Sequence, residues 1–251
     1  MKTATREGIR DCVLRIVVGL AIGIVMACAA GSFLSIAGFF KKTSQFFKNY
    51  ASNHEQWWVG LSPIIILLIS ALLILLVRRI FGISRFQTPK ETIQAVEESK
   101  TVNTKDGLAA TIASLISVSG GASVGQYGPL VVFGGTIGSL ISKYIGTNLP
   151  ASTWIGCGVA GAIGGGFGTP LAAIVFSHEV VLRRFSLKDV TPVALSAITA
   201  SILVDNSWFE RRLRLNHNID NVLTELLPFI VLCAPVFALS AILFMSLLKI
   251  S

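Results

Sequence analysis

Residues 119–138 read SGGASVGQYGPLVVFGGTIG, and we expect the chain to be organised around the Gly-rich turn in their centre. The turn passes directly into an apolar segment, and its residues are Gly125, Gln126, Tyr127, Gly128 and Pro129. Proline is favoured at the first position of a helix, where it has no N–H to lose, so a helix is predicted to start at Pro129. The glycines permit a tight turn that brings backbone N–H groups close to a ligand. Because a helix N-terminus attracts negative charge, the stretch predicts an anion site.

The composition is that of an integral membrane protein. Hydrophobic residues make up 53% of the 251 residues, charged residues 14%, and the mean hydropathy is +0.72. A soluble domain carries about 25% charged residues. Residues 16–40 and 57–77 contain no charged residue, and about 20 apolar residues are enough to cross a bilayer. We therefore predict an all-α protein that lies in the lipid bilayer.

The net charge of +8 comes from basic residues in short segments beside apolar runs. This arrangement follows the positive-inside rule, whereas nucleic-acid binding requires a clustered basic face, so no nucleic-acid partner is expected. Four cysteines without CxxC spacing are interpreted as small core residues: Cys12, Cys28, Cys157 and Cys233. Neither a metal nor a cofactor is expected, and no enzyme is predicted, since the P-loop lysine and the nucleophile elbow are absent.

Two long helices are predicted first, over about 13–40 and 59–79. Between them, Trp57 and Trp58 are interpreted as interfacial anchors, and the second helix ends at Arg78-Arg79, which should face the cytoplasm. The most polar stretch, 80–106, follows.

Within the polar stretch, Thr88 and Pro89 have the pattern of an N-cap followed by a first-turn proline. A short helix is expected over about 90–99. Two interpretations stay open: a solvated cytoplasmic helix, or a helix whose N-terminus points towards a pore.

After residue 106 the apolar segments become short and are interrupted by Gly, Ser and Pro. They cover about 107–118, 129–145, 153–167, 170–184 and 190–205. Broken helices at membrane depth occur where they are buried in protein or line a watery cavity, and in transporters their ends meet the substrate. Gly168-Thr169-Pro170 is interpreted as a second break of the cap-plus-proline kind. Glycines four residues apart, at 134/138, 161/165 and 164/168, predict close helix packing.

His178 and Glu179 are ionisable residues within an apolar segment, and such residues are often functional in membranes. One interpretation is a proton-carrying or metal-binding pair. The other is a structural ion pair between Glu179 and Arg183, four residues apart at a helix end, and we favour it. Lys143 and Tyr144 are interpreted as interfacial residues.

Two segments resemble the chloride channel (CLC) family. Gly125–Pro129, with SGGASV before it, is similar to the family's GREGP region. Residues 158–179, GVAGAIGGGFGTPLAAIVFSHE, are similar to the following family segment, with its Phe-Asn-Ala-Pro-Leu-Ala run and acidic helix end. The resemblance implies an anion channel or a chloride/proton exchanger, normally a homodimer with one pore per subunit. It also implies two inverted halves in each subunit, whose helix N-termini surround the anion.

The departures from the family pattern indicate passive transport. Tyr127 stands where the family has its gating glutamate, and a phenol stays neutral at physiological pH, although its hydroxyl can donate a hydrogen bond to a halide. The second family glutamate, which serves protons, corresponds to Val180, or to Glu179 if the register slips by one residue. The family's GSGIP motif corresponds to residues 85–89, where the proline is retained and Thr88 offers a hydroxyl from a neighbouring position.

The resemblance covers the first inverted half and one further helix. We expect a basic cytoplasmic tail over 1–15, a membrane domain over 16–221, and the first helix of a second half over 222–251. The family's GxFxP motif and its later pore tyrosine have no counterpart in this sequence. Two function hypotheses follow. The first is passive chloride movement across the plasma (inner) membrane, with a second copy or a partner supplying the missing half. The second is a transport-inactive half-protein with a structural or regulatory role.

Overall fold

The computed structural model describes residues 2–52, 62–122, 125, 127–145 and 149–204, and scattered positions between 228 and 246. The chain divides into two compact units, Met1–Asn206 and Ser207–Ser251. Every regular element among the described residues is a helix, which confirms the all-α prediction. In the second unit the scattered described positions are helical, and the boundary expected at 221/222 lies outside the described residues.

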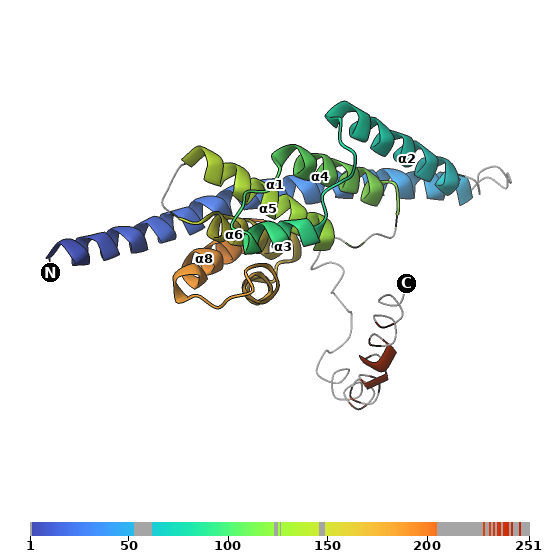
Figure 1. Cartoon of the computed structure of the whole chain (residues 1–251). Coiled ribbons are helices and arrows are strands. Elements are labelled where there is room, and N and C mark those ends of the chain that lie inside the picture. Colours follow the sequence, from blue (N-terminus) through green and yellow to red (C-terminus); the bar gives the residue numbers. More distant parts are fainter. Residues whose placement is uncertain are drawn as a thin grey trace. The chain divides into compact units, whose positions relative to one another are not determined.

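Two long helices begin the first unit, as predicted, although the first is longer than expected. Helix α1 covers Lys2–Ser52 and α2 covers Ser62–Phe81, with Arg78 and Arg79 in its last turn (Figure 1). The expected anchors Trp57 and Trp58 lie outside the described residues.

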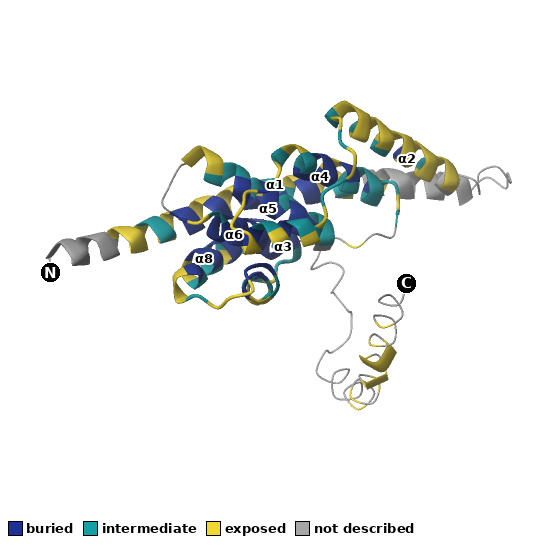
Figure 2. Ribbon diagram, in the orientation of Figure 1, coloured by how far each residue is buried: buried dark blue, intermediate teal, exposed yellow. Residues whose placement is uncertain are grey.

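Three described segments are long and apolar enough to cross a membrane: Arg10–Gly38, Ile64–Phe81 and Gly128–Ile145. Helix α2 is exposed over most of its apolar surface, with Leu72 66% and Ile80 71% exposed (Figure 2). Such a surface is unfavourable in water and is suited to contact with lipid.

The core of the first unit is built around α6, Ala151–Phe167, in which residues 152–166 are all buried (Figure 2). A helix that is apolar on every side is expected in the interior. Helix α6 packs against α1, against α5 (Tyr127–Ile145) and against α8 (Leu187–Leu203). It therefore connects the long N-terminal helix to the short helices that follow.

Glycines let the backbones of these helices come together. A Cβ added to Gly134 would lie 2.7 Å from the carbonyl carbon of Gly158, and one added to Gly164 would lie 2.6 Å from the carbonyl oxygen of Ala197. Real Cβ atoms do not come this close to backbone atoms, so only glycine fits at these crossings. The predicted close packing is confirmed there, but Gly168 serves differently: it ends α6 in the left-handed conformation, with φ 66°.

The predicted short helices are present, with shifted ends. They are α3 (Pro89–Glu97), α4 (Thr104–Ser119), α7 (Pro170–Phe176) and the π-helix η2 (Ser177–Val181). Helix α4 starts before the expected residue 107 because Asn103 caps it, its side chain accepting from the Lys105 N–H at 3.2 Å. The segment expected over 170–184 ends at Val181. Thr169 does occupy the N-cap before Pro170, but its side chain makes no capping bond.

The interpretation of the cysteines as core residues is correct for Cys157 and wrong for the others. Cys157 is fully buried in α6, whereas Cys12, Cys28 and Cys233 are exposed. Cys12 and Cys28 lie on the outward faces of α1, where a small apolar side chain is compatible with lipid. All four are free thiols.

Candidate functional site

The N-terminus of α3 carries a complete capping box. The Thr88 N–H donates to Glu91 Oε2 at 2.9 Å, and the Glu91 N–H donates to Thr88 Oγ1 at 3.4 Å. Pro89 occupies the first helical position, where it has no N–H to leave unpaired. The cap predicted from Thr88 and Pro89 is therefore confirmed, and Thr88 adopts the extended backbone expected of a capping residue.

Helix α5 begins at Tyr127, so the prediction that Pro129 starts this helix is wrong by two residues. The proline is tolerated in the first turn because the first four N–H groups of a helix have no partner within it. Gly125 is exposed and lies just before the helix. Gln126 and the side chain of Tyr127 lie outside the described residues.

The N-termini of α3 and α5 meet. A Cβ added to Gly128 would lie 3.5 Å from Cγ of Pro89, which is ordinary van der Waals contact. The structure thus brings together Thr88, Pro89, Gly128 and Pro129, which are about 40 positions apart in the sequence. Each helix N-terminus carries a partial positive charge. Two such ends in one place form a local surplus of positive potential that favours an anion.

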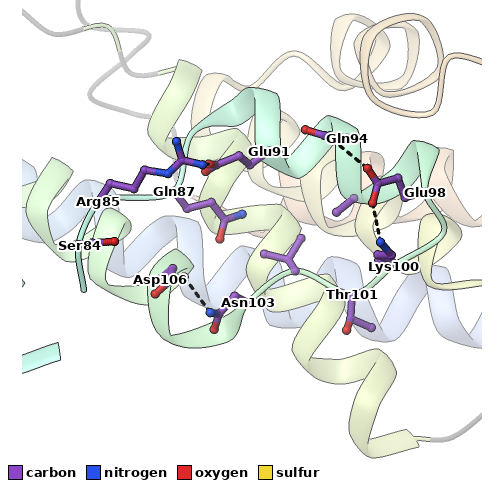
Figure 3. A pocket seen from close by; sticks show the side chains of 12 residues that line it. Ser84, Arg85, Gln87, Glu91, Gln94, Glu98, Lys100, Thr101, Asn103 and Asp106 are labelled. Carbon is purple, nitrogen blue, oxygen red and sulfur yellow. Dashed lines mark hydrogen bonds and ion pairs between the residues drawn. The ribbon is translucent and has the colours of Figure 1, made fainter. Parts of the chain in front are cut away.

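Charged side chains lie at both ends of α3 (Figure 3). Arg85 Nη2 lies 2.8 Å from Glu91 Oε1, and the Arg85 side chain is 83% exposed. Further along, Lys100 Nζ donates to Glu98 at 2.8 Å, and this hydrogen bond is the largest cause of a lowered pKa at Glu98. The sequence identifies 80–106 as polar but does not indicate this pairing.

A cavity of about 340 Å³ lies between α3 and the start of α4. Its polar lining includes Arg85, Gln87, Glu91, Glu98, Lys100 and Asp106 (Figure 3). The amide nitrogen of Gln87 donates to Thr92 Oγ1 at 3.0 Å, while its oxygen is buried without a partner among the described residues. This cavity was not predictable from the sequence, because it forms only where α3 and residues 100–106 fold against each other.

Glu179 and Val180, the two positions that correspond to the family's proton-carrying glutamate, lie on the π-helix η2. Glu179 is exposed and Val180 is partly buried. The predicted ion pair between Glu179 and Arg183 is wrong, because Arg183 binds Glu97 of α3 instead, with an N–O distance of 2.5 Å. The π-helix and the left-handed backbone of Arg183 (φ 50°) change the helical spacing on which the prediction depended.

His178 is buried on the same π-helix. Its Nδ1 lies 3.4 Å from the carbonyl oxygen of Arg184, and its ring centroid lies 4.9 Å from that of Phe185. Its Nε2 and the hydroxyl of Ser177 have no hydrogen-bond partner in the described part of the chain. Within that part, no cluster of three or more metal-binding side chains occurs, and the pair His178 and Glu179 is split between a buried and an exposed position.

A buried carboxylate joins three helices and was not identified from the sequence. Asp189, 4% exposed at the start of α8, accepts a 2.6 Å hydrogen bond from Thr153 of α6. Arg184 lies 3.4 Å and Arg15 of α1 lies 3.6 Å from its oxygens. One signal was available in the sequence: Asp189 directly precedes the apolar segment expected over 190–205, and acidic residues are favoured at the start of a helix.

Comparison with known proteins shows which family this chain resembles. A family model described as voltage gated chloride channel matches residues 86–251. A ClcB-like chloride channel protein of Ralstonia nicotianae is 32% identical over 108 residues, covering 41% of this chain and 25% of that protein. The voltage-gated ClC-type chloride channels ClcB of Escherichia coli and Shigella boydii are 26% identical over 197 residues, covering 76% of this chain. The chain spans about half the length of these ClcB relatives, 47%.

Proposed function

This chain belongs to the voltage-gated chloride channel family, and we propose that the junction of α3 and α5 forms one side of a pathway for chloride or a similar anion. The observation that carries the proposal is the proximity of the two helix N-termini, where a Cβ added to Gly128 would lie 3.5 Å from Pro89 Cγ. In a medium of low dielectric constant, partial charges act more strongly than in water. The N-termini of broken helices are used in this way by membrane transporters that bind anionic groups.

We further propose that the anion moves passively. Tyr127 stands in the position of the gating glutamate and remains neutral at physiological pH. Val180 has no ionisable group, and the neighbouring Glu179 is exposed rather than directed into the core. The two carboxylates that carry protons in family exchangers are thus absent or displaced. The residues of the proposed site are Thr88, Gly125, Gln126, Tyr127, Gly128 and Pro129.

An anion in the bilayer interior needs polar groups on every side, because desolvation of a charge costs several kcal/mol or more. The α3–α5 junction supplies one side. We propose that the other side comes from a second copy of the chain in a homodimer, or from a partner with the complementary half. The proposed location is the plasma (inner) membrane, as a multi-pass protein.

The test is flux from reconstituted vesicles. Vesicles loaded with KCl are diluted into a low-chloride buffer, valinomycin is added, and chloride release and external pH are recorded together. The proposal predicts chloride efflux without uphill proton uptake. Stoichiometric proton movement would contradict passive transport. Absence of chloride release from vesicles with correctly folded protein would favour the second hypothesis, a structural or regulatory membrane role.

A further inference from the structure

We propose that the cavity between α3 and the start of α4 binds a small organic cation that carries a primary ammonium group. None of the described residues that line this cavity belongs to α5, so the site is distinct from the α3–α5 junction. Arg78 and Arg79, at the end of α2, are expected to face the cytoplasm. The ligand therefore reaches the cavity from the cytoplasm.

The size of the cavity suits a small molecule. Its volume is about 340 Å³, and binding sites for small molecules usually measure about 300–1,000 Å³. One water molecule occupies about 30 Å³ in the liquid, so the cavity has room for a ligand of several non-hydrogen atoms. Most of the lining is polar, and the side chains of Ala95 and Val102 add an apolar part that suits a short carbon chain.

Four of the charged side chains that line the cavity already form two ion pairs (Figure 3). Arg85 Nη2 lies 2.8 Å from Glu91 Oε1, and Lys100 Nζ lies 2.8 Å from Glu98 Oε2. Each of the four oxygens of these two carboxylates has a nitrogen donor within 2.9 Å. The two pairs therefore leave neither a surplus charge nor an acceptor without a donor.

Two further side chains of the lining offer acceptors that are still free. Asp106 Oδ2 accepts from the Asn103 amide at 2.7 Å, but no basic side chain in the described part of the chain pairs with Asp106, and its Oδ1 has no donor there. The Gln87 amide donates to Thr92 through Nε2, while its Oε1 is buried without a partner among the described residues. A buried carbonyl oxygen without a donor is unfavourable, so the cavity lacks a donor and a positive charge.

A primary ammonium group supplies both of these. It has three N–H donors and a positive charge, which suit the free carboxylate oxygen of Asp106 and the buried amide oxygen of Gln87. A quaternary ammonium group has the charge but no N–H. Calcium and magnesium ions take about six or more oxygen ligands, and no group of three or more metal-binding side chains occurs in the described part of the chain. The lining therefore favours an amine over a metal ion.

Binding of putrescine, a four-carbon diamine, tests the proposal. The full chain in an uncharged detergent is titrated by calorimetry at neutral pH, where a primary amine is protonated as the lysine side chain is, and the ionic strength is kept constant. We expect saturable binding by the wild type. Asp106→Asn keeps the size of the side chain and removes its charge. It should weaken putrescine binding about tenfold, because a charge-assisted hydrogen bond is lost.

Three comparisons separate this site from a general attraction of cations. Asp11→Asn makes the same substitution at an exposed position of α1 and should leave the affinity within about twofold, since exposed charges are screened. Gln87→Met removes the buried amide oxygen at a similar side-chain size and should also weaken putrescine binding. Tetramethylammonium should not compete with putrescine, and this comparison uses the wild type, so it does not depend on the folding of a variant.

Putrescine binding that Asp106→Asn weakens and Asp11→Asn leaves unchanged supports the proposal. Absence of saturable putrescine binding by the folded wild type overturns it. An equal loss of affinity in Asp106→Asn and Asp11→Asn also overturns it, because the attraction would then be general, and so does equally tight binding of tetramethylammonium. Chloride release from vesicles tests the proposed function separately, so the two ideas fail independently.

Discussion

The crossing of α5 and α6 depends on the absence of a side chain at Gly134. In Gly134→Ala, the new Cβ would lie 2.7 Å from the Gly158 carbonyl carbon and 2.8 Å from Cα of Val159. These are backbone atoms, so no rotamer change relieves the overlap. Ordinary contact begins at 3.4 Å, and the two helices must therefore separate by at least about 0.7 Å.

The cost of this separation follows from the packing. A radial gap of about 0.5–1 Å removes roughly a quarter to a half of the dispersion energy of the contacts it affects, and overpacked cores lose about 1–3 kcal/mol. The overlap with backbone places this case at the upper end of that range. Because alanine has a higher helix propensity than glycine, the substitution also stabilises the folded state by up to about 1 kcal/mol. We expect a net loss of about 2 kcal/mol in the free energy of unfolding.

The measurement is an SDS titration of protein in mild detergent, followed by circular dichroism. Gly31→Ala is the matched control, because Gly31 lies within helix α1 and a Cβ there would meet nothing within 4 Å. It should be neutral or slightly stabilising. If Gly134→Ala unfolds at the same SDS fraction as the wild type, or if both variants lose the same stability, the packing argument is refuted.

Three further predictions concern single residues. Thr88→Ala should lower the free energy of unfolding by about 1 kcal/mol through loss of the cap, and Thr88→Ser should restore it; equal stability of all three proteins would contradict the capping role. Asp189→Asn should cost about 2 kcal/mol, because it leaves the largely buried Arg15 without its carboxylate, while the half-exposed Arg184 stays solvated. The control variant Glu98→Gln removes a carboxylate at an exposed site and should leave the SDS fraction at the midpoint of unfolding unchanged. In a variant whose other three cysteines are serine, Cys157 should react with a maleimide only after denaturation, since it is 0% exposed; rapid labelling of the folded protein would place it at an accessible surface.

Local features of the fold were predictable because they depend on neighbouring residues. The Thr88-Pro89 cap requires only residues 88–91, and the break after Gly168 requires only a glycine that adopts a positive φ before a proline. The long apolar runs likewise predict membrane helices whatever lies around them. Errors at this level were shifts of helix ends, such as the start of α5 at Tyr127 instead of Pro129. Helix ends are set by caps and by packing as well as by composition.

Contacts between distant residues were not predictable in the same way. Glu179 precedes Arg183 by four residues, and a regular helix would place the two side chains side by side. Because of the π-helix, the Arg183 side chain instead donates to Glu97 of α3, which is 86 positions away in the sequence. Arg15 reaches the start of α8, where it donates to the Lys188 carbonyl oxygen and lies beside Asp189. The choice of partner depends on which helices pack together, and hydrophobic periodicity does not specify it.

The sequence by itself determined that this protein is an all-α membrane protein, that α3 and α7 begin with a proline and that α6 ends at Gly168, because each of these properties follows from residues within one or two turns. Only the tertiary structure decided that the starts of α3 and α5 lie close together at Pro89 and Gly128. Helix α3 also approaches α5 at Gly135, where an added Cβ would overlap the Thr92 side chain, and such approaches between distant residues exist only when the helices pack. A single helix N-terminus attracts an anion weakly, and the meeting of two makes the candidate site.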